Sequence, residues 1–305
     1  MGLEIIAGVD GSAESLAAAD WAAREAGRRG LPLRLVHAWL WQPLDLPLVQ
    51  EEGDQQRLAE HVAEEAATAV AAAHPDVALS AEVVPDTPVP GLLGLQERAA
   101  MVVIGSRGHG PVAGFLLGSY GQQIIAGAER PVVAVRPGRG GEGAGADDDS
   151  GEVVVGQLGG ADDSASALRF AFETAAARGA VLRAVRAWSL PPLYAYSPGS
   201  MRLADEAGGL VPFEEKALHE VLAPWRERYP DVRVAEHVEI GSAGEVLLSA
   251  SASASLLVVG RRAKRGAVGP RIGSVAVRPY TVGWLIAAAV TAAWAVWRFF
   301  GRGDR

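Results

Sequence analysis

The chain contains no cysteine among its 305 residues. This absence excludes a disulfide framework, a thiolate metal site and a cysteine nucleophile, and it fits a reducing compartment. Basic residues are also in the minority, because 28 lysines and arginines face 36 aspartates and glutamates, for a formal net charge of -8. Charge-driven binding to nucleic acid needs a basic surface, so we predict no nucleic-acid partner.

Several motifs that carry chemistry are missing too. No Gly-x-x-x-x-Gly-Lys-Ser/Thr run supplies a P-loop lysine, and no Gly-x-Ser-x-Gly run supplies a nucleophile elbow. The six histidines are scattered, with no pair at ligand spacing, so we predict no protein metal site. The apolar run near the N-terminus lacks a basic flank and breaks at Asp10, which is not typical of a secretory signal. We therefore expect a cytoplasmic protein.

Strand-like and helix-like patterns alternate along the first half of the chain. Short apolar runs of strand type are separated by longer stretches in which alanine and leucine recur at helical spacing. This alternation predicts a mainly parallel sheet with helices on both faces. The predicted strands are 4–9, 33–39, 77–84, 101–105 and 131–135, and the predicted helices are 13–29, 51–73, 89–99 and 119–128.

The second half repeats the first. The run Arg-Leu-Val-His-Ala-Trp at 34–39 returns as Arg-Ala-Val-Arg-Ala-Trp at 183–188, and Val-Ala-Val-Arg-Pro at 133–137 returns unchanged at 275–279. Between the halves, residues 137–151 are rich in glycine and acidic residues, as in a flexible linker. We predict two tandem doubly wound domains, each with a mainly parallel five-stranded sheet, at 1–136 and 152–279.

The two repeats differ where the first carries its distinctive residues. In the second repeat, Leu158 stands where the first has Asp10, and Ala263 stands where the first has Gly108. Fourteen positions separate Ser119 from Val133 in the first repeat, whereas Val275 follows directly on a serine in the second. The sequence therefore predicts that the second repeat has a degenerate motif and lacks its last helix.

A glycine-rich arrangement follows the predicted strand 101–105. It consists of Gly105-Ser106-Arg107-Gly108, nine further residues and Gly118-Ser119. Glycines let a backbone approach a phosphate closely, and Ser119 can cap a helix whose free N–H groups attract an anion. Arg107 adds a positive charge. Asp10 ends the first strand at the same edge of the sheet, where ligands of such sheets bind, and its carboxylate can accept bonds from a ribose or an adenine.

Each of these residues also has a simpler explanation. Glycines in loops usually serve turns, Ser119 is sufficient as a plain helix cap, and Asp10 followed by glycine is a common turn. Taken together on one sheet edge, the residues predict nucleotide binding.

On these residues the chain resembles a tandem universal stress protein, over nearly all of residues 1–279. The resemblance rests on Gly-Val-Asp-Gly-Ser at 8–12 and on the Gly-2x-Gly-9x-Gly-Ser spacing. It implies that ATP or a related adenine nucleotide, with or without Mg, lies between the first-strand aspartate and the glycine loop. Asp10 and the backbone near Ala38 would then face the base and ribose. The residues that would face the phosphates are Gly105, Arg107, Gly108, Gly118, Ser119 and Tyr120, of which Tyr120 stands where the family usually has a small or β-branched residue.

The same resemblance implies a ligand-dependent stress-response regulator that is not an enzyme and has no catalytic residues. The second repeat would pair with the first inside one chain, with or without homodimerisation. Two alternatives stay open: a slow ATPase or phosphotransferase on the same site, and a nucleotide-free interaction protein of the same fold.

The C-terminal segment is the one long apolar run. Residues 280–297 carry no charge, and Arg278 and Arg298 bracket them. We expect an apolar helix at 280–298. Its length is at the lower limit for a membrane span, which would anchor the domains to the inner face of a membrane. The alternatives are a helix that packs on the second sheet and a tail with no selected function.

Overall fold

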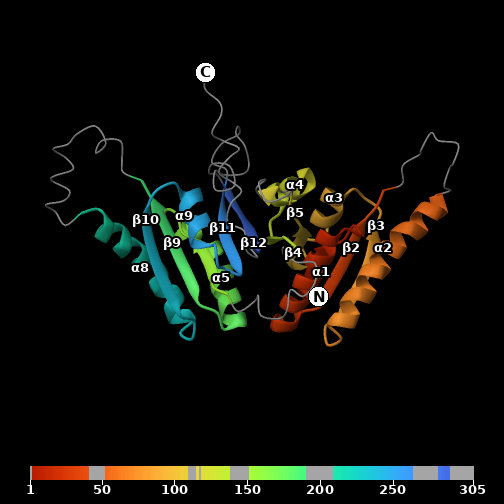
Figure 1. Ribbon diagram of the computed structural model, residues 1–305, viewed down its shortest axis with the longest axis horizontal. Helices are drawn as coiled ribbons and strands as arrows, with labels where there is room; N and C mark the ends of the chain where they lie inside the picture. The colour runs from red at the N-terminus through yellow and green to blue at the C-terminus, as the bar shows by residue number, and fades with distance from the viewer. Residues whose placement is uncertain are drawn as a thin grey trace, which may run out of the picture. The chain divides into compact units, whose positions relative to one another are not determined.

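The computed structural model describes residues 2–40, 52–108, 115–116, 118–137, 151–189, 209–263 and 281–288. The chain forms two compact units (Figure 1): unit 1 comprises Met1–Arg139 with Gly283–Ala288, and unit 2 comprises Gly140–Val282 with Ala289–Arg305. Nearly all of the predicted linker lies outside the described residues. So does the stretch around Val275, in which the sequence predicts the loss of a helix.

Unit 1 is a parallel α/β sheet flanked by helices. Its main elements are β1 (Glu4–Gly8), α1 (Ala13–Arg29), β2 (Leu33–Ala38), α2 (Glu52–Ala73), β3 (Leu79–Val84), α3 (Pro88–Leu93), β4 (Ala99–Gly105), α4 (Ser119–Gly127) and β7 (Val132–Val135). The strands pair in the order β3-β2-β1-β4-β7, all parallel. The helices α1 and α2 contact one another and the strands, and α3 and α4 form a second such pair.

Unit 2 repeats this arrangement with four described strands of its own. Its elements are β8 (Val153–Gly156), α5 (Ala161–Arg178), β9 (Leu182–Trp188), α8 (Val211–Arg228), β10 (Val234–Ile240), α9 (Ala243–Ala250) and β11 (Leu256–Ala263). The strand order is β10-β9-β8-β11, again all parallel. The predicted fold class, two mainly parallel sheets flanked by helices, is confirmed.

Local signals explain where the first helix of each unit starts and stops. The Ser12 side chain accepts a hydrogen bond from the backbone N–H of Ser15 at 3.2 Å, which caps α1. Gly30 ends α1 with a φ of 61°, and Gly179 ends α5 with a φ of 62°. Glycine adopts this left-handed conformation without steric cost, so the sequence-predicted end of α1 at Arg29 is confirmed.

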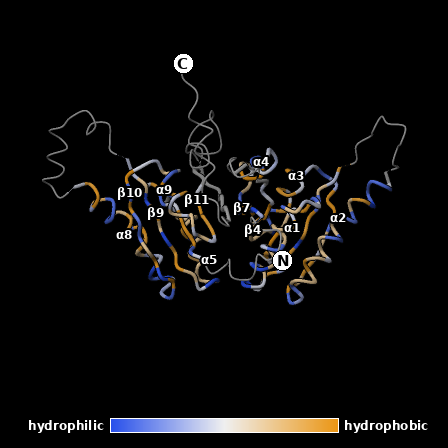
Figure 2. The backbone as a smooth tube through the Cα atoms, viewed as in Figure 1, coloured by the Kyte–Doolittle hydropathy of each residue, from blue (hydrophilic) through white to orange (hydrophobic). Residues whose placement is uncertain are grey.

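The long helix α2 shows how a polar helix is held on the sheet. Its buried residues recur at helical spacing and are mostly small: Ala59, Ala63, Ala66 and Val70. The remaining positions are largely polar, so the hydropathy of the tube changes repeatedly along the helix (Figure 2). A narrow apolar stripe of this kind packs against β2 and β3 and leaves the rest to solvent.

The predicted helix at 89–99 is wrong in its second half. The helix α3 begins at Pro88, ends at Leu93 and has Gly94 as its C-cap. Strand β4 already begins at Ala99. The helix stops at Gly94, and Ala99 pairs with Glu4 of β1 instead.

The expected apolar helix at 280–298 is also wrong, because residues Thr281–Ala288 form a strand, β12. This strand lies parallel to β7, with Leu285 opposite Val132 and Ala288 opposite Val135. An edge strand presents unpaired backbone groups, and an uncharged run with β-branched residues can pair with it. Residues 289–298 lie outside the described part of the chain. Over the described ranges, the helices are too short or too polar to cross a bilayer.

Buried and half-buried ion pairs hold the strand starts together in both units. In unit 1, Glu4 accepts hydrogen bonds from Arg34 at 2.9 Å and from Arg98 at 3.1 Å. In unit 2, Arg183 donates to Glu152 at 2.7 Å. These hydrogen bonds raise the pKa of Arg34 and of Arg183, so both guanidinium groups stay charged. The first and second strands of each unit are thus tied in the same way.

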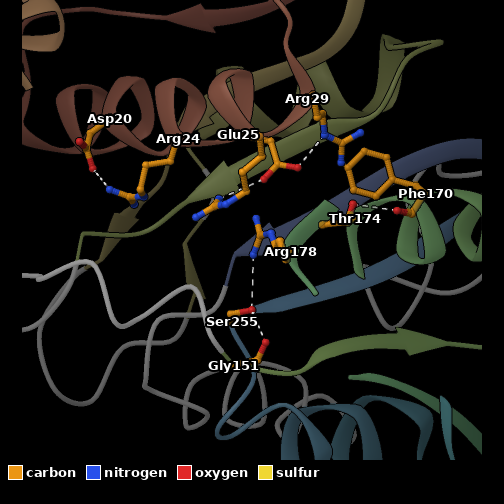
Figure 3. Close-up of polar contacts among 10 residues, drawn as sticks. Asp20, Arg24, Glu25, Arg29, Gly151, Phe170, Thr174, Arg178 and Ser255 are labelled. Carbon is orange, nitrogen blue, oxygen red and sulfur yellow. Dashed lines mark hydrogen bonds and ion pairs between the residues drawn. The ribbon is translucent and has the colours of Figure 1, made fainter. Parts of the chain in front are cut away.

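The first helices differ in how they satisfy a buried polar position. In α1, the buried Glu25 accepts a hydrogen bond from Arg29 at 2.7 Å (Figure 3). In α5, the buried Thr174 donates its hydroxyl to the carbonyl of Phe170 at 2.7 Å. Ser255 closes the start of unit 2 by donating to the Gly151 carbonyl at 2.9 Å. Glu25, Thr174 and Ser255 thus each have a hydrogen-bond partner, as is usual for buried polar groups.

Candidate functional site

The strand order of unit 1 creates a point at which the chain diverges. From β1 the chain passes to β2 on one side, whereas β4 lies on the other side of β1. In open parallel sheets, ligands bind outside the carboxyl ends of the strands at such a point. We call the "β1/β4 edge" the set of three segments gathered at these ends: Asp10–Ser12 after β1, Gly105–Gly108 after β4 and Gly118–Tyr120 at the start of α4. Most of the predicted site residues belong to this edge.

Asp10 is held by a turn at the end of β1. Its Oδ1 accepts hydrogen bonds from the backbone N–H of Ser12 at 3.0 Å and from the Ser12 hydroxyl at 2.5 Å. Gly11 has a φ of 78°, a left-handed conformation that glycine adopts readily. The carboxylate remains exposed to solvent. The turn therefore fixes a negative charge at the β1/β4 edge, as the sequence predicted for a base- or ribose-binding group.

Ala38 lies at the neighbouring strand end, beside a histidine. The Nδ1 of His37 lies 2.8 Å from the carbonyl oxygen of Val9, which can only accept, so Nδ1 carries the proton. Behind Ala38, α3 approaches closely: a Cβ on Gly91 would lie 3.3 Å from the Ala38 Cβ. Packing of α3 therefore fixes the backbone at Ala38, and the histidine joins β2 to the turn that carries Asp10.

Gly105 has a packing role that the sequence did not reveal. A Cβ at this position would lie 2.7 Å from the backbone carbon and oxygen of Glu14 and 2.8 Å from the nitrogen of Ser15. Real Cβ atoms do not approach backbone this closely. The glycine therefore allows the first turn of α1 to lie directly against the end of β4, and its presence alone is not evidence of a ligand.

Gly118 has no comparable role in the described structure. It is the N-cap of α4, with a φ of -57°, and a Cβ there would meet no atom within 4 Å. Neither backbone strain nor packing against described residues requires the glycine, and its local role is that of a favoured N-cap residue. Ser119 is the first residue of α4, not its cap as predicted, and no side-chain hydrogen bond caps the helix. Tyr120 is 57% exposed. The first turn of α4 thus keeps backbone N–H groups that have no partner within the helix.

Arg107 and Gly108 form β5 (Arg107–Gly108), which pairs antiparallel with β6 (Phe115–Leu116). Arg107 lies opposite Leu116, which precedes Gly118 by two positions. Paired residues in such a ladder lie about 5 Å apart. The ladder therefore brings the backbone after β4 close to the start of α4, in agreement with the predicted grouping of Gly108 and Gly118.

Ser106 belongs to the same loop and was not among the predicted site residues. It is 1% exposed, and its backbone N–H donates to the Val135 carbonyl at 2.8 Å. Its hydroxyl is buried and has no hydrogen-bond partner in the described structure. Buried polar groups nearly always have a partner. The sequence placed Ser106 inside the glycine motif, but only the tertiary structure shows that its hydroxyl is unsatisfied.

In unit 2, side chains of the unit itself form hydrogen bonds at the corresponding strand ends. Arg186, at the position of His37, donates to Gln157 Oε1 at 2.5 Å, to the Gly159 carbonyl at 3.2 Å and to Glu214 on α8 at 2.6 Å. Leu158, at the position of Asp10, is 46% exposed. The edge therefore presents a leucine instead of a carboxylate, and its cation already has a partner. Aligning the two repeats already shows these differences, with Arg186 in place of His37 and Leu158 in place of Asp10.

A metal centre finds no support in the part of the chain that the structure describes. No group of three or more histidine, aspartate or glutamate side chains is placed there to hold a metal ion. The basic residues Arg261 and Arg262 lie in β11, but their side chains are not among the described ones, and Lys264 and Arg265 lie outside the described residues.

Comparison with known proteins agrees with this geometry. The sequence profile of the Universal stress protein family matches residues 3–136 and 152–278. The universal stress protein Rv2005c of Mycobacterium tuberculosis is 35% identical over 279 residues, which cover 89% of this chain and 91% of that protein. Rv1996 of the same organism is 34% identical over 306 residues and covers 90% of each chain.

A solved structure shares the fold of the whole chain. The crystal structure of a universal stress protein from Archaeoglobus fulgidus superposes with a TM-score of 0.64 at 17% identity, covering 93% of this chain and 97% of that chain. At this identity the likeness establishes the fold alone. It extends over both units, as expected for a tandem duplication.

Proposed function

The chain belongs to the universal stress protein family, and we propose that unit 1 binds an adenine nucleotide, with ATP as the first candidate, at the β1/β4 edge. One observation carries the proposal: a fixed carboxylate after β1 and the uncapped N-terminus of the nine-residue helix α4 lie on the two sides of the point where the chain diverges. These groups suit the two ends of a nucleotide, since the carboxylate accepts hydrogen bonds and the helix N-terminus attracts anions.

The phosphate end would lie at α4. The backbone N–H groups of Ser119 and Tyr120 point toward the helix N-terminus, and among the described residues no atom lies within 4 Å of a Cβ placed on Gly118. Arg107 adds a positive charge from the paired loop. Gly118, the N-cap of the helix, carries no side chain that would cover these N–H groups.

The base and ribose end would lie between Asp10 and Ala38. The exposed carboxylate of Asp10 can accept a hydrogen bond from a ribose hydroxyl or from the adenine amino group. Close packing by Gly91 holds the Ala38 backbone in place for a further contact. A carboxylate would repel phosphate, so the nucleotide would bind in one orientation.

We propose that binding regulates the protein's part in a stress response. The groups at the β1/β4 edge hold and orient a ligand, and ligand-dependent signalling needs no more than that. Mg binding, a cytoplasmic location and pairing of the repeats within one chain stay predictions from the sequence.

The experiment is to identify and titrate the ligand. Gently purified protein is denatured, and the released small molecules are identified by mass spectrometry; calorimetry with ATP, ADP and adenosine then gives affinity and stoichiometry. We expect an adenine nucleotide at one equivalent per chain. Absence of nucleotide and of ATP binding would favour a nucleotide-free interaction protein. Phosphate released in excess over protein, and lost in Asp10→Ala, would favour a slow ATPase.

A further inference from the structure

The buried hydroxyl of Ser106 is the most unusual polar group at the β1/β4 edge. The side chain is 1% exposed, and its Oγ has no partner among the described residues. A buried hydroxyl without a hydrogen bond costs stability, so such a group calls for an explanation, and a bound ligand is one. The backbone of Ser106 is already satisfied through the Val135 carbonyl, so the side chain alone lacks a partner.

The register of β4 places Ser106 on the side of the sheet that α4 covers. Side chains alternate along a strand, so Ser106 shares a face with Ile104 and opposes Gly105. Gly105 faces the first turn of α1. Ile104 packs in one cluster with Ile124 and Ile125 of α4. Ser106 therefore continues the strand face that contacts α4.

Ser106 and the first turn of α4 also lie at the same level along the strand direction. Ser106 lies two residues beyond Ile104, about 6.6 Å farther toward the carboxyl end of the strand at about 3.3 Å per residue. Tyr120 lies four residues before Ile124, about 6 Å toward the helix N-terminus at about 1.5 Å per residue. Since α4 links two parallel strands, it runs opposite to them and these shifts have the same direction. Ser106 is thus level with the first turn of α4.

We propose that the Ser106 hydroxyl is a phosphate-binding donor that acts together with the N-terminus of α4. The inference rests on the proposed nucleotide site and names the class of group that Ser106 would bind, a phosphoryl oxygen of the nucleotide. A hydroxyl donates one hydrogen bond, and a phosphoryl oxygen is a charged acceptor, which makes the bond stronger than one to a neutral group. The unit 2 repeat has Arg261 at this position.

The test uses the full chain and compares Ser106→Ala with the wild type by calorimetry and thermal unfolding. We expect Ser106→Ala to weaken the binding of ATP and of inorganic triphosphate about tenfold. Adenosine affinity should not change, because adenosine carries no phosphate. The thermal midpoint of the ligand-free variant should equal or exceed that of the wild type, because an unsatisfied hydroxyl is removed.

Ser164→Ala is the matched control. Ser164 is also buried, but its hydroxyl donates to the Leu158 carbonyl at 2.9 Å and accepts from the Leu158 N–H at 3.3 Å. Its loss should lower the thermal midpoint and leave ATP affinity unchanged.

Two results would overturn the role of Ser106: unchanged ATP affinity in Ser106→Ala, or a lower thermal midpoint of the ligand-free variant. A wild type that binds triphosphate and not ATP would refute the nucleotide proposal. The role of Ser106 would then be tested by comparing the triphosphate affinity of Ser106→Ala with that of the wild type. A wild type that binds neither overturns both proposals.

Discussion

The two units use the same strand-end position in opposite ways. His37 of unit 1 donates to the Val9 carbonyl, and the Asp10 carboxylate is exposed at the edge. Arg186 of unit 2 spans from β9 to the turn after β8 and to Glu214 on α8. The longer, charged side chain ties three segments together. The comparison teaches that one duplicated unit uses its strand ends for internal ion pairing, whereas the other has an exposed carboxylate there.

The glycines at the two edges show the same divergence. A Cβ on Gly105 would lie 2.7 Å from the backbone of Glu14, whereas a Cβ on Gly260 would lie 3.7 Å from the Ala167 Cβ, an ordinary contact. The first helix therefore approaches the strand end more closely in unit 1. Gly8 and Gly156 remain alike, since a Cβ on either would lie 3.0 Å from a leucine side chain. Between these two pairs of glycines, the packing therefore differs where the first helix begins and not at the end of the first strand.

The largest effect should follow from breaking the Arg186 network. We expect Arg186→Ala to lower the free energy of unfolding of unit 2 by about 3 kcal/mol, because the largely buried Glu214 and Gln157 lose their partner. His37→Ala should cost about 1 kcal/mol, the value of one neutral hydrogen bond. Denaturant titration followed by tryptophan fluorescence measures both, and equal losses would contradict the contrast between the units.

The variant Asp10→Asn tests the difference between Asp10 of unit 1 and Leu158 of unit 2. Asparagine retains the oxygen that accepts from Ser12 and removes the charge, so the turn should persist. We expect ATP affinity to fall ten- to hundredfold, because a charged hydrogen bond is worth about 1.5–3 kcal/mol. Inorganic triphosphate should be affected less than ATP. Leu158→Asn is the unit 2 control, and calorimetry should find its ATP affinity equal to that of the wild type.

Helix packing at the two edges is compared by Gly105→Ala and Gly260→Ala. The first change forces a methyl group into the backbone of α1, and overpacking of this kind costs about 1–3 kcal/mol. The second should stay within about 0.5 kcal/mol, as for a tolerated surface change. Chemical unfolding measures the free energy of unfolding of both variants. Equal stability of the two variants would show that α1 can shift away from β4.

The smallest expected effect is that of Gly118→Ala, and it falls on binding. A methyl group there meets no described protein atom within 4 Å, so the free energy of unfolding should fall by only about 0.5–1 kcal/mol, the cost of replacing a favoured N-cap glycine with alanine. ATP affinity should fall about tenfold, since the methyl group would enter the space proposed for phosphate. Gly273→Ala, the corresponding change in the second repeat, is the control in the same titration. Equal losses from the two changes would remove the asymmetry.

Much of the fold could be predicted because its determinants are local. The Ser12 cap and the Gly30 stop define α1, and the apolar runs define the buried strands. The predicted helix at 89–99 failed because pairing with β1, which is distant in sequence, decides where β4 starts. The C-terminal run failed for the same reason: its apolarity fits a helix and a strand equally well, and the free edge of β7 decides between them.

For the candidate site, too, local features could be predicted from the sequence and features that depend on distant contacts could not. Residue type and spacing predicted Asp10, Gly108 and Gly118 as site residues, because turns and helix termini depend on neighbouring residues. The roles of Gly105 and Ser106 depend on atoms that are distant along the chain, the first turn of α1 and the face of α4. Sequence by itself determined the duplicated parallel fold and the strand-end motif. Tertiary structure alone decided which glycine serves packing and which buried hydroxyl lacks a partner, because steric contact and hydrogen-bond satisfaction arise only when distant segments meet.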